Sequence, residues 1–115
     1  MTAGSFHPAI ARRIRKDEAL VRALKEIGAD AGMMIMHAQR EWASITFSGV
    51  RHSLTYAFDG AEAVAHAERM IALLPEHEFS LPGQLVADAA VTNIEHRIEP
   101  PRIVLDCELL VLDED

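Results

Sequence analysis

Cysteine and long apolar runs are nearly absent from this chain of 115 residues. Cys107 is the single cysteine, which excludes an internal disulfide framework and a multi-cysteine zinc site. The most apolar stretch, residues 103–112, is interrupted by Asp106 and Glu108, so it falls short of the ~18–20 residues that a helix needs to cross a bilayer. Residues 1–8 lack the basic start and apolar core of a secretory signal. We therefore expect a cytoplasmic protein with no membrane partner.

Cations are in the minority, because 11 Lys and Arg residues stand against 18 Asp and Glu residues and leave a net charge of −7. Such a surface repels a phosphate backbone, so we expect no nucleic-acid partner. The one basic run, residues 12–16, is followed directly by Asp17 and Glu18. Half of the residues are hydrophobic and a quarter are charged, which is typical of a folded globular protein. The length predicts one domain over residues 1–115.

Recognisable catalytic and ligand-binding motifs are missing from the sequence. It contains no Gly-rich phosphate loop, no His-Glu-x-x-His, no Gly-x-Ser-x-Gly and no Cys-x-x-Cys. Its six histidines do not pair at the i,i+2 or i,i+4 spacing that usually marks a metal site. They are His7, His37, His52, His66, His77 and His96. We therefore predict no catalytic residue, no metal and no cofactor, and favour a protein that is not an enzyme.

Two segments have the periodicity of amphipathic helices. Residues 8–27 begin with Pro8, repeat Ile10, Ile14, Val21 and Leu24 at helical spacing, and end before a glycine. Residues 61–74 form a second apolar stripe, which a proline ends. The two stripes predict helices that cover one face of a sheet.

Five strands are predicted by alternation of apolar and polar residues. Residues 33–36 are a short apolar strand, and residues 42–47 and 51–58 form a hairpin around Ser48-Gly49. Residues 84–96 and 102–113 form two long strands joined by a link that ends in Pro100-Pro101. The element order α-β-β-β-α-β-β predicts a single α+β domain, with a mostly antiparallel five-stranded sheet and two helices on one face.

One phase of the strands is assigned to the core. Its members are Ile45, Phe47, Leu54, Tyr56, Phe58, Leu85, Ala87, Ala89, Val91, Ile103, Leu105, Cys107, Leu109 and Val111. Cys107 is expected to be a poor nucleophile among these aliphatic residues, because burial disfavours the thiolate. The methionines of residues 33–36 would suit an adaptable binding surface, but we favour a place at the end of the core.

The other phase of the last two strands is unusually apolar for a sheet face that meets water. In a register that pairs Ile94 with Val104, it contains five large aliphatic residues. These are Val86, Ile94, Val104, Leu110 and Leu112. Covering them by sheet-on-sheet packing in a homodimer would stabilise the protein by several kcal/mol at ~25 cal/mol per Å². Alternatively, they reflect the β-propensity of aliphatic residues and lie under a loop or the chain terminus.

Two sets of residues are candidates for a ligand site. Asp88, Asp106 and Glu108 share the outer phase, where they would form an oxygen-ligand or acid/base site, or remain solvated edge charges. His52 and Tyr56 share the inner phase and would line a pocket between helices and sheet, unless His52 is a hydrogen-bonded core residue.

The element order, size and acidity resemble those of the small acidic chaperones of type III secretion, which are α/β homodimers that wrap effector segments. The resemblance assigns no residue a role. We expect a non-enzymatic, chaperone- or adaptor-like protein that self-associates through its sheet and binds another polypeptide. The alternative is a small-molecule- or metal-binding protein, possibly a small enzyme, with a pocket between helices and sheet.

Overall fold

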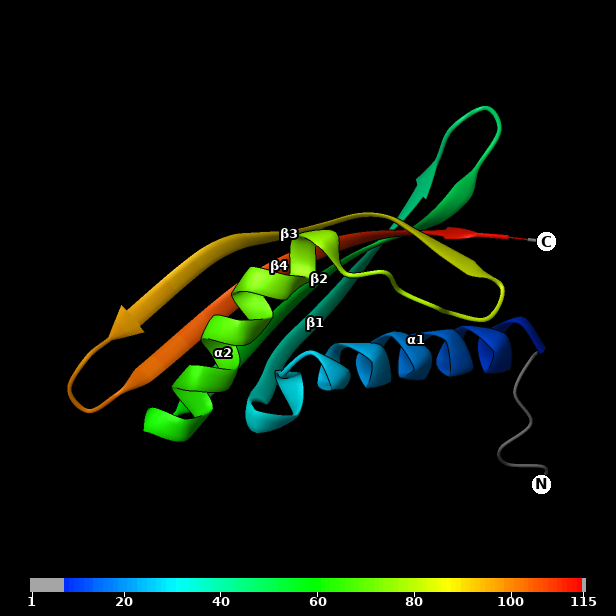
Figure 1. Ribbon diagram of the computed structural model, residues 1–115. Helices are drawn as coiled ribbons and strands as arrows, with labels where there is room; N and C mark the ends of the chain where they lie inside the picture. Colours follow the sequence, from blue (N-terminus) through cyan, green and yellow to red (C-terminus); the bar gives the residue numbers. More distant parts are fainter. Residues whose placement is uncertain (1–7, 115) are drawn as a thin grey trace, which may run out of the picture.

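The computed structural model describes residues 8–114, which form two helices and one sheet (Figure 1). The helices are α1 (Pro8–Glu26) and α2 (Ala61–Leu73), and short 3-10 turns follow them at Ala29–Ala31 and Leu74–Glu76. The strands are β1 (Met33–Ala43), β2 (Ser48–Asp59), β3 (Gln84–Arg97) and β4 (Arg102–Asp113). Neither helix is long and apolar enough to span a bilayer.

The sheet has four strands, so the prediction of five strands in the order α-β-β-β-α-β-β is wrong. Residues 33–36 and the first two residues of the next predicted strand, Trp42 and Ala43, belong to one continuous strand, β1. Apart from Ala38, residues 37–41 are polar on both phases, which conceals a strand from pattern analysis but is tolerated at a sheet edge, where both faces meet water. The element order is therefore not the one on which the resemblance to secretion chaperones rested.

The turn between β1 and β2 lies before Ser48-Gly49, at residues 44–47. The Ser44 backbone N–H donates to the Phe47 carbonyl over 2.8 Å, and the Phe47 N–H donates to the Ser44 hydroxyl over 3.1 Å. Ile45 and Phe47, assigned to the core above, are consequently exposed in the turn. Gly49 lies within β2, where an added Cβ would collide with the Val111 carbonyl of β4. Glycine is needed there for close strand approach.

The strand order is β1-β2-β4-β3, and every neighbouring pair is antiparallel. The chain passes from β2 through α2 to β3 at the far edge of the sheet, and β4 then returns between β2 and β3. β2 and β4 are thus central, while β1 and β3 are the two edges. This order decides which backbone groups remain unpaired.

The core lies between the central strands and the two helices, which pack on the same face of the sheet. Leu54, Tyr56 and Phe58 of β2 alternate with outward residues, and the odd-numbered residues of β4 from Ile103 to Val111 do the same. In Figure 1, α2 crosses in front of the sheet and α1 runs beside β1. The helix residues buried in this core are Leu20, Leu24, Val64, Ala67 and Met70.

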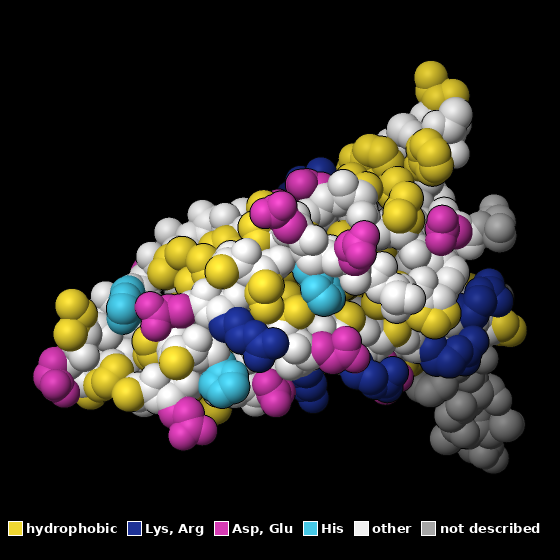
Figure 2. Space-filling model, viewed as in Figure 1, with side chains coloured by type: hydrophobic (Ala, Val, Ile, Leu, Met, Phe, Trp, Pro, Cys, Tyr) yellow, Lys and Arg dark blue, Asp and Glu magenta, His cyan; other side chains and the backbone are white. Residues whose placement is uncertain are grey.

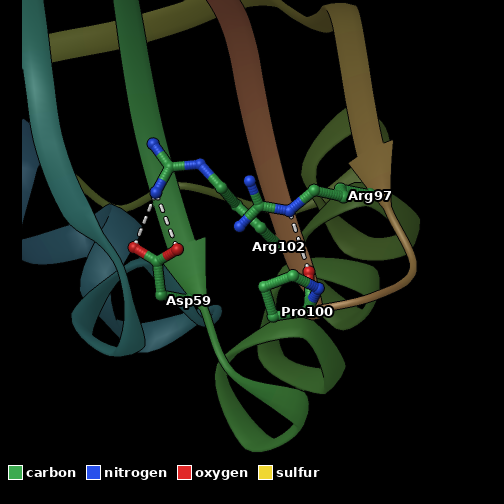
Figure 3. A network of polar contacts seen from close by, with 4 residues as sticks. All are labelled: Asp59, Arg97, Pro100 and Arg102. Atoms are coloured by element: carbon green, nitrogen blue, oxygen red, sulfur yellow. Dashed lines mark hydrogen bonds and ion pairs between the residues drawn. The ribbon is translucent and has the colours of Figure 1, made fainter.

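A polar network closes the end of the sheet at the start of α2 (Figure 3). Arg102 Nη1 contacts both carboxylate oxygens of Asp59 at 2.6 and 2.8 Å. In the β3–β4 turn, Arg97 Nε donates to the Pro100 carbonyl over 2.9 Å. The Gly60 N–H donates to the Pro101 carbonyl over 3.0 Å, which ties this turn to the segment that leads into α2. These groups satisfy one another, so we regard the network as structural.

Candidate interaction surface

Strand β1 is an open sheet edge that begins with an exposed apolar run. Met33, Met34, Ile35 and Met36 expose between 42% and 70% of their surface, although we had favoured the core for the methionines. β1 pairs with β2 on one side only, within the described part of the chain. An edge strand presents free N–H and C=O groups on its other side, so a long apolar edge is a template for pairing with another strand.

The opposite edge, β3, is much less suited to strand pairing. Its ladder with β4 is interrupted between Val86 and Asp88 and again between Val91 and Asn93. Such bulges bend and twist a strand, and the exposed carboxylates of Asp88 and Glu95 add charge to this edge. Bulges and edge charges are the devices by which proteins prevent edge-to-edge association. The apolar part of β1 has one irregularity, between Met34 and Met36, and no charge.

One side of α1 faces the β1 edge and is partly apolar. Ile10, Ile14, Asp17 and Val21 follow one another at intervals of four, three and four residues, which places them in one stripe along the helix. Asp17 Oδ2 in this stripe accepts a hydrogen bond from Gln39 Nε2 of β1 over 2.8 Å. Ile10 and Ile14 are exposed, although the sequence pattern had placed them in the buried stripe. A strand added to β1 would therefore lie beneath this side of α1.

His37 of β1 and His52 of β2 form a hydrogen-bonded pair on the helix-covered face. His37 Nε2 lies 2.8 Å from His52 Nδ1, and the ring centroids are 5.1 Å apart. The pKa of His52 is lowered from 6.5 to about 4, mainly by burial and then by the adjacent His37, while Asp17 opposes the shift and Arg13 adds to it slightly. His52 is 1% exposed, so it is a neutral, satisfied core histidine rather than an accessible acid or base.

The structure does not gather the five predicted interface aliphatic residues on one face. Ala90 pairs with Glu108 as expected, but each of the two bulges in β3 adds one residue and reverses the faces beyond it. Val86 and Ile94 consequently pair with Val111 and Leu105 on the helix-covered face, while Leu85 moves to the outer face. Of the remaining three, Leu110 and Leu112 are buried and Val104 is half-buried.

The three candidate acids Asp88, Asp106 and Glu108 do share the outer face. Asp106 Oδ1 accepts a hydrogen bond from the Thr55 hydroxyl over 2.7 Å, and Glu108 Oε1 lies 3.7 Å from Arg51 Nη1. Two of the acids are thus engaged by β2, and Asp88 is exposed at the β3 edge. Residues 8–114 contain no cluster of three or more His, Cys, Asp or Glu side chains suited to a metal ion, and His7 lies outside the described residues.

His52 and Tyr56 lie two positions apart on the helix-covered face, where both are buried. Burial, followed by the nearby Cys107, raises the pKa of Tyr56 to about 12, and its buried hydroxyl has no hydrogen-bond partner among the described residues. Burial raises the pKa of Cys107 to about 12 as well, with smaller effects from Asp106 and Glu108. Cys107 is buried, as predicted. None of these groups is accessible to a ligand from solvent.

A basic cleft lies on the exposed side of α1, where Figure 2 shows a group of Lys and Arg side chains. It has a volume of about 460 Å³, and its lining residues are Arg12, Arg15, Lys16, Glu18, Ala19, Arg22 and Pro82. Lys16 Nζ contacts Asp113 Oδ1 at the end of β4 over 2.9 Å. The sequence contained the basic run, but the contribution of Pro82 depends on the path of a distant loop.

Sequence analysis also failed to predict that residues 33–36 lie exposed at a sheet edge. The available signal was that residues 37–41 contain neither glycine nor proline, so nothing ends a strand between Met36 and Trp42. Comparison with known protein families, curated proteins and solved structures gives no match.

Proposed function

We propose that this protein is a non-enzymatic interaction domain that forms a homodimer by pairing the β1 strands of two copies. The observation that carries the proposal is the exposed apolar run 33–36 on an uncharged part of a sheet edge. The dimer would be a continuous eight-stranded sheet with all helices on one side. Self-association thus uses the edge of the sheet, because the outer face is polar across its middle, where Arg51 pairs with Glu108 and Thr55 bonds Asp106.

A second copy is the partner because the β1 edge complements itself. Its methionines lie at the start of the strand, whereas Arg13 shares a cleft with residues 41–43 at the other end. Ile10 and Ile14 flank Arg13 along α1, so they lie toward that same end. A two-fold axis through the middle of β1 pairs the strands antiparallel and brings Met34 of each copy, which pairs with Tyr56 on the helix-covered face, toward the isoleucines of the other. Met33 and Met36 pair with Ala57 and Thr55, so they lie on the outer face of the sheet.

The magnitude of the apolar contribution is sufficient for association. Complete burial of a Met or Ile side chain contributes about 1.5–3 kcal/mol, and these side chains are roughly half exposed, so each contributes roughly 1 kcal/mol. The side chains of residues 33–36, eight in the two copies, together with the backbone hydrogen bonds of a new strand pair, contribute an amount comparable with the ~4–15 kcal/mol that association costs in lost freedom.

Light scattering of purified protein over a range of concentrations tests the proposal with two matched variants. Ile35→Lys places a charge on the β1 edge, and Ile94→Lys places the same charge on the β3 edge. The native side chains expose 55% and 45% of their surface, so both lysines can reach water without unfolding the chain. We expect a dimer for wild type and Ile94→Lys, and a monomer for Ile35→Lys with an unchanged circular dichroism spectrum.

Two results would contradict the proposal. Wild-type protein would be monomeric at every concentration, or the two variants would dissociate to the same extent. The second result would show a general effect of surface charge. The alternative function, a small-molecule or metal site, has less support in the geometry, because His52 and Tyr56 are buried and Asp106 and Glu108 are engaged by β2.

A further inference from the structure

We infer a second interaction surface, independent of dimerisation: the basic cleft between α1 and Pro82 binds an acidic segment of another polypeptide. The cleft volume of about 460 Å³ lies within the ~300–1,000 Å³ range of sites that hold a small ligand, and a few residues of an extended chain are of this size. Its lining combines four cations with one carboxylate, Glu18.

The arrangement of the cations favours carboxylates as ligands. Arg12, Arg15 and Arg22 are exposed, and their spacing places them on one side of the helix around Ala19. Arginine presents a planar fork that binds a carboxylate through two parallel hydrogen bonds. The Lys16–Asp113 contact shows a carboxylate already held at the margin of this cleft. Ala19 and Pro82 provide an apolar floor for a segment that mixes acidic and apolar residues.

The distribution of charge over the molecule favours a partner that is negatively charged and short. Helix α1 has six cations against three carboxylates, whereas the whole chain has a net charge of −7, so the surface outside the helix is strongly acidic. A long nucleic acid would extend from the cleft over Asp113 and Glu114, where like charges repel it. A short acidic peptide segment meets the cations without this cost.

The basic cleft and the dimer edge lie on opposite sides of α1. The side that faces β1 contains Ile10, Ile14 and Val21, and helical spacing places Arg12, Arg15 and Arg22 roughly half a turn away. A bound acidic segment therefore leaves the β1 edge free. The two interactions can be tested separately on the full chain.

Fluorescence anisotropy with a labelled peptide of alternating Glu and Leu at low salt tests the inference. The variant Arg15→Glu/Arg22→Glu reverses two cations of the cleft. The control Lys25→Glu/Arg69→Glu makes the same change of charge at two exposed cations outside it, one of them on α1. We expect binding by wild type and control, a loss of affinity of about tenfold or more in the cleft variant, and normal binding by Ile35→Lys.

Several outcomes would overturn the inference. The wild type would not bind the peptide, the cleft variant and the control would lose affinity equally, or Ile35→Lys would abolish binding. Tighter binding of single-stranded DNA of equal charge, or of anionic vesicles, with the same loss in Arg15→Glu/Arg22→Glu would assign the cleft to nucleic acid or to a lipid surface instead.

Discussion

His52 illustrates how one polar residue in a core is satisfied by a residue on the neighbouring strand. Its ring is enclosed beneath α1 between the apolar residues of β2, and His37 from the edge strand provides the hydrogen bond at 2.8 Å. Without this bond, burial of a neutral imidazole would leave an unsatisfied donor or acceptor, at a cost of about 1–3 kcal/mol. The pair thus ties the side chains of β1 to the central sheet.

The lowered pKa of His52 predicts that stability falls as the pH falls from about 6.5 to about 4. In this range the unfolded chain binds a proton that the folded chain does not, so protonation favours unfolding. Lowering the pH from neutral to about 5 should cost about 2 kcal/mol in the free energy of unfolding. Urea denaturation at several pH values measures this dependence for wild type, His52→Leu and the exposed control His96→Leu. The free energy of unfolding should depend less steeply on pH in His52→Leu alone, and an unchanged dependence in that variant would show that His52 is not the cause.

At the scale of elements, α1 is anchored by its carboxyl-terminal half. Leu20 and Leu24 are buried in the core, while Ile10 and Ile14 of the amino-terminal half are exposed. The amino-terminal half is held to the sheet by polar contacts, Lys16 with Asp113 and Asp17 with Gln39. Contacts of partly exposed groups contribute little to stability, typically up to about 1 kcal/mol each. The packing of the helix therefore depends on a few leucines.

Two alanine substitutions compare the contributions of the two halves of α1 to stability. Leu24→Ala removes a fully buried side chain and should lower the free energy of unfolding by about 2–5 kcal/mol. Ile14→Ala changes an exposed position and should alter it by less than about 0.5 kcal/mol. Both are measured by urea denaturation in the Ile35→Lys background, so that dimer dissociation does not contribute. Equal losses would mean that the amino-terminal half is packed as tightly as the other.

The elements also show what a pattern can predict. Both helices and the last two strands lie within about one or two residues of their predicted bounds, because their periodicity is local and their ends are marked by proline or glycine. β1 was divided in two because its middle is polar on both sides. The bulges in β3 were missed because one extra residue leaves the alternation on either side intact while it exchanges the faces.

At the scale of the whole molecule, the strand order leaves a short apolar run on an open edge of the sheet. If β1 lay between two strands, both backbone edges of residues 33–36 would be paired; in the order β1-β2-β4-β3 one of these edges is free and the side chains are exposed. The outer face is polar across its middle, where Arg51 pairs with Glu108 and Thr55 bonds Asp106. A one-sided antiparallel sheet of this kind is stable with that face in water.

Val104→Lys distinguishes pairing through the edge from packing through the face. Val104 is a half-buried aliphatic residue on the outer face, so a lysine there would disrupt sheet-on-sheet packing without touching β1. We expect Val104→Lys to remain dimeric in light scattering, beside monomeric Ile35→Lys. Dissociation of Val104→Lys with retention of the Ile35→Lys dimer would place the interface on the face.

The sequence by itself determined the two helices, the last two strands, the apolar phase of β4 that forms the core, and the acidity of the molecule. These properties depend on local spacing and composition. The tertiary structure alone decided that β1 is an edge, that Val86 and Ile94 lie on the helix-covered face, that His37 meets His52, and that Pro82 completes a basic cleft. Exposure and contact depend on which distant segments pair, and strand pairing is set by the packing of the whole chain rather than by the residues of one strand.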